Sequence, residues 1–93
     1  MTNKVKSAFA YGSLSPAKVS VLETKAALML ELTDILDASG MTQVQAARRF
    51  GVSQPRVSDL RRGKIAEFSV DMLIGMLART GRDVKVAVRR KTG

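Results

Sequence analysis

The spacing of apolar residues predicts a long amphipathic helix over residues 15–38. Apolar side chains recur there every three or four positions, which places them on one face of a helix. Ser15 followed by Pro16 predicts the start, because serine caps the first amides and proline is tolerated in the first turn. The residues expected to face the core are Val21, Leu28, Met29, Leu32, Ile35 and Leu36.

Two short helices joined by a tight turn are predicted between Thr42 and Gly63. Thr42 and Gln45 have the spacing of a capping box at the start of the first helix. Gly51 follows the last apolar residue of that helix, and a glycine can take the positive φ that a sharp turn requires. Ser53 can then cap the second helix. This succession of signals is typical of a helix-turn-helix.

A further helix is predicted after Ser69, which can cap it, and we expect this helix to end at Gly81. Phe68 has the position of a residue that packs on Leu73 as a hydrophobic staple. Gly75 inside the helix costs about 1 kcal/mol relative to alanine. We therefore expect a close contact at Gly75 that a larger residue would not allow.

Residues 83–89 change the pattern from helical to alternating, which predicts a half-buried strand. Val84, Val86 and Val88 would share one face of this strand. A single strand leaves its amides and carbonyls unpaired, so its expected partner is the same strand of a second chain, antiparallel across a two-fold axis. The alternative is a segment that lies on its own helices or frays.

Together these elements predict a mostly α-helical fold, a bundle of four to five helices with a helix-turn-helix and one C-terminal β-strand that pairs across a dimer. The predicted organisation is a flexible N-terminal arm over residues 1–14, a helix-turn-helix domain over 15–82, and a dimerisation strand with a basic tail over 83–93. A chain of 93 residues is expected to form one domain with a modest core.

The composition excludes several classes of function. The sequence contains neither cysteine nor histidine, which rules out disulfides, the usual ligand set of a structural zinc, and histidine-based catalysis. No pair of carboxylates or lysines has a recognisable catalytic framework, so we expect no enzyme, no metal site and no cofactor. No apolar run approaches a membrane span and no secretory signal is evident, so we expect a soluble cytoplasmic protein without a membrane partner.

The net charge of +8 is concentrated in the C-terminal half of the chain. Residues 1–47 carry four basic and four acidic side chains, whereas residues 48–93 carry twelve basic and four acidic side chains. A basic half that contains a helix-turn-helix favours a polyanion as partner, above all double-stranded DNA. The alternative is a solvated basic face that only keeps the protein soluble.

The helix-turn-helix segment also has a specific resemblance. Residues 42–64 have the sequence TQVQAARRFGVSQPRVSDLRRGK and resemble the helix-turn-helix of lambda-type repressors, the Cro/Xre family. The wider segment from Lys25 to Arg90 is similar to small Xre-type antitoxins that accompany RelE-like toxins. This resemblance implies a repressor that binds a palindromic operator as a homodimer, controls its own operon and neutralises a RelE-like toxin. The alternatives are a stand-alone phage or mobile-element repressor and a protein-interaction module without DNA readout.

The second short helix supplies the candidates for base contacts, because a helix-turn-helix places this helix in the major groove. Gln54 matches a family position whose glutamine reads adenine, and Arg56 has donors that suit guanine. Two roles are possible for Asp59. Its carboxylate can accept a hydrogen bond from cytosine, or it can form a salt bridge with Arg56 or Arg62 on the same helix. The predicted base-reading residues are Gln54, Pro55, Arg56, Ser58 and Asp59.

A second group of residues is expected to contact phosphates, which sets affinity without reading the sequence. Gln43 belongs to it through its resemblance to the glutamine that opens the first helix in the family. The predicted phosphate-binding residues are Gln43, Ser53, Arg61, Arg62 and Lys64. Arg48 and Arg49 either join this group or belong to a solvated helix surface.

The N-terminal arm contains three bulky apolar residues, Phe9, Tyr11 and Leu14, in an otherwise mixed segment. They are expected either to pack on the surface of the domain or to fold onto a protein partner, for which the resemblance implies the toxin.

Overall fold

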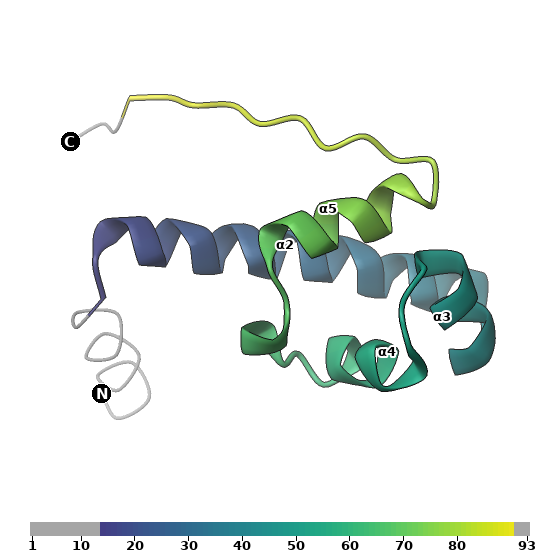
Figure 1. Ribbon diagram of the computed structural model, residues 1–93. Helices are drawn as coiled ribbons and strands as arrows, with labels where there is room; N and C mark the ends of the chain where they lie inside the picture. Colours follow the sequence, from purple (N-terminus) through teal and green to yellow (C-terminus); the bar gives the residue numbers. More distant parts are fainter. Residues whose placement is uncertain (1–13, 91–93) are drawn as a thin grey trace.

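The helices form close to their predicted positions. The structure, a computed structural model, describes residues 14–90 and contains in that range four α-helices and one 3₁₀-helix (Figure 1). Their bounds are α2 Pro16–Ser39, α3 Gln43–Phe50, α4 Gln54–Arg61, η1 Ile65–Glu67 and α5 Val70–Ala78. The last helix ends earlier than predicted, and a turn carries the chain from α5 to Gly81. The mostly α-helical fold predicted from the sequence is confirmed.

Short-range hydrogen bonds fix the starts of the helices. The hydroxyl of Ser15 accepts a bond at 3.2 Å from the amide three residues later. Thr42 and Gln45 make both bonds of the predicted capping box, at 3.2 and 3.0 Å. Ser53 and Ser69 cap α4 and α5 in the same way. Because the partners in each cap lie three residues apart, local sequence is sufficient to predict them.

The core lies between α2 and the helices that follow it. α5 packs on α2, α3 packs on α4, and η1 contacts α2. The buried apolar residues are Met29, Leu32, Leu36, Ala46, Ala47, Phe50, Val57, Leu60, Phe68, Leu73, Met76 and Leu77. Within residues 14–90, no helix is both long enough and apolar enough to cross a membrane.

The first half of α2 differs from the prediction. This part of the long helix extends beyond the N-terminal start of α5, as Figure 1 shows. Val21 was expected in the core but is 45% exposed, whereas Leu32 and Leu36 on the second half are buried as predicted. The apolar period of a helix identifies the face that can be buried, but it does not say how much of that face another element covers.

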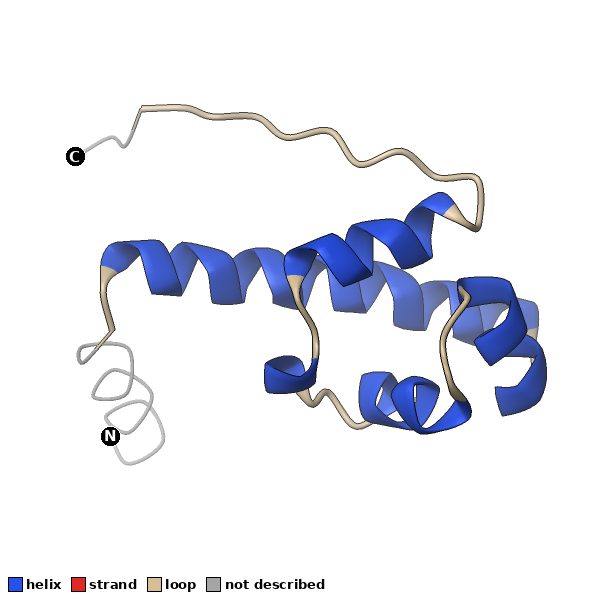
Figure 2. Cartoon of the chain, viewed as in Figure 1, coloured by secondary structure: helices blue, strands red, loops and turns tan. Residues whose placement is uncertain are grey.

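The predicted C-terminal strand is not observed in the single chain. Residues 82–90 follow α5 as extended chain, drawn as a loop in Figure 2, and no strand occurs within residues 14–90. Val84 packs against the core, but Val86 and Val88 are 81% and 94% exposed. The physical reason is that a β-strand needs a hydrogen-bonded neighbour, and the described part of the chain supplies none.

Gly75 lacks the close neighbour that the sequence led us to expect. A Cβ atom built on this exposed residue would meet no other atom within 4 Å in the described part of the chain. No contact within residues 14–90 therefore offsets the flexibility that a glycine adds to the unfolded state.

Replacing Gly75 with alanine is expected to raise the free energy of unfolding by about 1 kcal/mol, because alanine loses less backbone entropy in a helix. Urea denaturation followed by circular dichroism measures this change. The matched control is Ala27→Gly at an exposed position of α2, which should lower stability by a similar amount. A loss of stability in the Gly75→Ala chain would contradict the expectation and show that something outside the described residues contacts this position.

Candidate DNA-binding surface

The turn between α3 and α4 is closed by a glycine and covered by an arginine. Gly51 has a φ of 72°, and its amide donates to the carbonyl of Ala47. The amide of Val52 donates to the same carbonyl at 2.9 Å. A Cβ atom at Gly51 would also clash with the side chain of Arg79, which lies over the turn from the end of α5. Both the backbone conformation and the position of Arg79 therefore favour glycine here.

Helix α4 presents one side to the core and the opposite side to solvent. Val57 and Leu60 are each 1% exposed and fix the helix against the bundle. Gln54 and Pro55 are exposed, and Ser58 is half-buried. The helical period places Pro55, Ser58 and Asp59 on the side away from Val57 and Leu60, and Asp59 is the one of these that is held by ion pairs. The outer side of α4 therefore offers an amide, a hydroxyl and an apolar ring to a partner.

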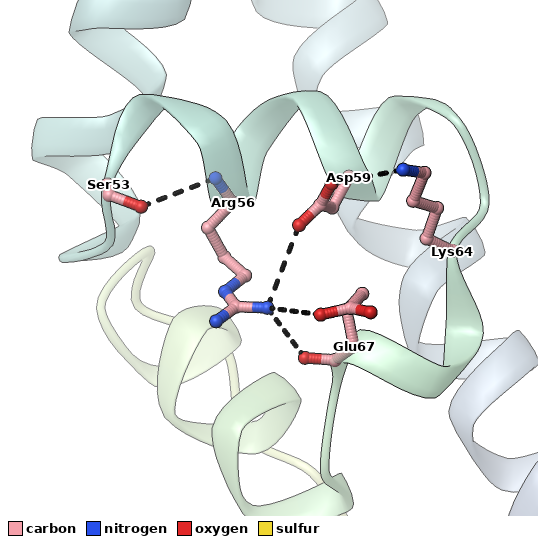
Figure 3. Close-up of polar contacts among 5 residues, drawn as sticks. All are labelled: Ser53, Arg56, Asp59, Lys64 and Glu67. Atoms are coloured by element: carbon pink, nitrogen blue, oxygen red, sulfur yellow. Dashed lines mark hydrogen bonds and ion pairs between the residues drawn. The ribbon is translucent and has the colours of Figure 1, made fainter.

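Arg56 does not extend toward that outer side. Its guanidinium is turned toward η1, where Nη1 donates to the carbonyl oxygen of Glu67 at 2.8 Å (Figure 3). The same nitrogen lies 3.7 Å from Oδ2 of Asp59. Asp59 also lies 4.0 Å from Nζ of Lys64, and no ion pair joins it to Arg62 among the described residues. Two of the predicted base-reading residues are therefore paired with each other.

The predicted phosphate-binding residues lie at the ends of α3 and α4 or just beyond them. All of them are exposed: Gln43, Ser53, Arg61, Arg62 and Lys64. The Ser53 hydroxyl accepts from a backbone amide at 3.3 Å, which leaves its own proton for another acceptor. Arg61 forms a 3.0 Å ion pair with Asp37 at the end of α2. Arg48 and Arg49, in the last turn of α3, are also exposed.

Three residues of this surface were not predicted from the sequence. Asp37 pairs with Arg61, the carbonyl and carboxylate of Glu67 both face Arg56, and the ring of Phe68 lies 5.6 Å from the Arg56 guanidinium. Each partner comes from an element other than α4, so its approach depends on how the bundle packs. The short-range patterns that reveal helix caps carry no signal for such contacts.

The predicted protein-binding residues are mostly not observable. Phe9 and Tyr11 lie outside the described residues. Leu14 is half-buried beside the first turns of α2, where it lines a shallow groove with Val21 and Leu22.

Comparison with known proteins agrees with this arrangement. A family model described as a helix-turn-helix domain matches residues 10–89. A solved structure assigned to the XRE family of transcriptional regulators is 35% identical, with a TM-score of 0.72 and coverage of 80% of this chain and 83% of that chain. No curated protein matches the sequence. The chain therefore belongs to the XRE family of helix-turn-helix proteins.

Proposed function

We propose that this protein is a sequence-specific DNA-binding transcriptional repressor. The observation that carries the proposal is the placement of α4, which is fixed on the bundle by Val57 and Leu60 while its other side stays open. The major groove of B-DNA admits an α-helix, and the second helix of a helix-turn-helix is the element that enters it. The similar solved structure is itself assigned as a transcriptional regulator.

Base contacts are assigned to the exposed part of α4. The amide of Gln54 has a donor and an acceptor, which match the adenine edge in the major groove. Pro55 has no polar side-chain atom and suits the methyl group of thymine, and the Ser58 hydroxyl suits either a donor or an acceptor on a base. These three residues supply different chemistry from one side of one helix.

Phosphate contacts are assigned to Gln43, Ser53, Arg62 and Lys64, which lie exposed around the ends of α3 and α4. Arg61 joins them despite its ion pair with Asp37, because both side chains of that pair are largely exposed. An exposed ion pair contributes at most about 1 kcal/mol. Arg61 can therefore exchange the carboxylate for a phosphate at a small cost in free energy.

A homodimer is proposed from the C-terminal segment. Val86 and Val88 share one side of an extended segment and are almost fully exposed in the single chain. The same segment of a second copy, running antiparallel, would pair the backbone groups and cover both valines. A two-fold dimer would present two copies of α4 about 34 Å apart, which corresponds to a palindromic operator with half-sites one helical turn apart.

The antitoxin role is a finer proposal that rests on the resemblance of residues 25–90 to antitoxins of RelE-like toxins. In such a pair the protein represses its own operon and neutralises the toxin. The shallow groove at the start of α2, which includes Leu14, is an exposed apolar surface that a protein partner could cover.

The proposed function is tested with the DNA upstream of the gene and the variant Gln54→Ala. We expect the natural chain to prefer this DNA over a scrambled duplex in gel-shift titrations. Gln54→Ala should lose about 1–3 kcal/mol of discrimination at one base pair per half-site, because a bidentate amide contact disappears. Gln43→Ala is the matched control, since loss of a phosphate contact should weaken all sequences equally.

Two results would contradict these proposals. If the natural chain binds scrambled DNA as tightly as the upstream DNA, it is not a sequence-specific repressor, and a protein-interaction module becomes the better explanation. If the product of the neighbouring gene neither copurifies with the protein nor changes the gel shift, the antitoxin role is rejected, and a stand-alone repressor remains.

A further inference from the structure

The side chain of Arg56 contacts three residues, Asp59, Glu67 and Phe68, and Figure 3 shows the first two. Nη1 donates to the Glu67 carbonyl oxygen at 2.8 Å and lies 3.6 Å from the carboxylate of the same residue. On its own helix, Asp59 Oδ2 lies 3.7 Å away. The guanidinium also lies over the ring of Phe68, which is 2% exposed. Arg56 therefore connects α4 to η1 and to the core residue that follows it.

These contacts occupy one of the two terminal nitrogens with which an arginine would read guanine. A guanidinium reads guanine by directing two parallel N–H donors at O6 and N7 of the base. In Arg56, one terminal nitrogen already donates to a backbone carbonyl that cannot be removed by a change of side chain. The helical period also places Arg56 on the flank of α4 rather than beside Pro55 and Ser58 on the outer side.

Arg56 also compensates the only carboxylate on α4. Asp59 is a short side chain, 23% exposed, on the helix proposed to enter a groove lined by phosphates. Without a cation beside it, this carboxylate would repel the DNA backbone. Arg56 and Lys64 lie on its two oxygens, at 3.7 and 4.0 Å.

We infer that Arg56 is a positioning residue for DNA recognition and does not itself read a base. It fixes the orientation of α4 relative to η1 and Phe68 and keeps the charge of Asp59 compensated, so that Gln54, Pro55 and Ser58 meet their bases together. This inference rests on the proposed function and gives Arg56 a role different from that expected of an arginine on a recognition helix.

The test is Arg56→Met, which keeps an unbranched side chain on Phe68 but removes the donors and the charge. Binding is titrated against the operator, against operators with each base pair changed in turn, and against a scrambled duplex, at a temperature at which circular dichroism shows a folded variant. Operator affinity should fall by about 10-fold or more, the scale of one charge-assisted hydrogen bond. The loss of discrimination should spread over all base pairs that the natural chain distinguishes. Affinity for scrambled DNA should fall by a clearly smaller factor, because only the uncompensated charge of Asp59 acts on every sequence.

Arg62→Met is the matched control, because Arg62 is an exposed arginine at the end of the same helix and has no ion pair among the described residues. It should weaken operator and scrambled DNA by the same factor and reduce the salt dependence of binding. A positioning residue and a phosphate contact therefore differ in which DNA sequences lose affinity. The two arginine variants distinguish the roles by this difference as well as by the size of the loss.

Two outcomes of the Arg56→Met titration would overturn the inference. A loss of about 5- to 150-fold that is confined to one base pair per half-site would show that Arg56 reads a base. An equal loss for operator and scrambled DNA would show that Arg56 acts only through its charge and does not position the base-reading residues. If the natural chain binds operator and scrambled DNA equally well, the proposed function is rejected. The titration of the natural chain shows this before any variant is compared.

A second variant keeps the inference testable if Arg56→Met does not fold. Glu67→Gln removes a 54% exposed carboxylate near Arg56 and leaves the backbone carbonyl in place. It should reduce discrimination by up to about 5-fold, the scale of an exposed ion pair, at the same base pairs together. A gain of discrimination at a single base pair would mean that Arg56 had been released to read it, which would overturn the inference.

Discussion

A chain carrying both Val86→Asn and Val88→Asn is expected to be monomeric and to bind its operator about 10² to 10⁴ times more weakly than the natural chain. The two valines are 81% and 94% exposed in the single chain, so polar replacements cost nothing in its own core. In the proposed dimer they would bury polar side chains between the subunits. A monomer also loses the gain in affinity that comes from linking two recognition helices.

Sedimentation equilibrium measures the oligomeric state, and gel shifts on the full palindrome and on a half-site measure the effect on binding. Asparagine leaves the net charge unchanged, so any change in DNA affinity is not due to lost cations. The matched control is Ala87→Asn, which alters the other face of the same segment and should remain dimeric. A double variant that stays dimeric would reject the proposed interface and move it to another surface of the molecule.

Operator affinity is expected to fall by about three to five powers of ten when the salt concentration rises from 50 to 200 mM, provided that the dimer contacts about six to ten phosphates. The physical reason is the release of counterions from DNA by basic side chains. The whole net charge of +8 lies in residues 48–93, and Arg62 and Lys64 are exposed beside α4.

The slope of log affinity against log salt, obtained by fluorescence anisotropy, measures the number of phosphates contacted. Arg62→Gln should reduce this slope by about two units for a dimer, one for each half-site. An exposed lysine far from the recognition helix, Lys18 on α2, provides the control, and Lys18→Gln should leave the slope unchanged. Binding that is nearly independent of salt would contradict the proposed phosphate contacts.

Features that depend on neighbouring residues were predictable from the sequence. The capping box of Thr42 and Gln45 and the caps at Ser15, Ser53 and Ser69 each involve residues three positions apart. The helix period also identified the buried side of α4, because apolar residues at helical spacing mark the face that can be buried. The helical fold could therefore be predicted from local patterns alone.

Features that depend on the approach of distant elements were not predictable in this way. The exposure of Val21 follows from where α5 begins relative to α2, which no pattern within α2 records. Arg56 meets the carbonyl of Glu67 only because η1 folds back beside α4. The alternation of Val84, Val86 and Val88 fits a strand, but the part of the chain that the structure describes has no neighbouring strand with which to pair.

The contacts of Arg79 and Arg56 at the start of α4 have a consequence for folding during synthesis. Arg79 lies over Gly51, and the Glu67 carbonyl holds Arg56 in the first turn of α4. Both partners follow the helix-turn-helix in the chain, and a ribosome delivers residues from the N-terminus at about 5–20 per second. A nascent chain that has released only the helix-turn-helix therefore lacks the contacts that orient its recognition helix. If the chain binds DNA as proposed, we therefore expect it to become competent for binding only after α5 has emerged.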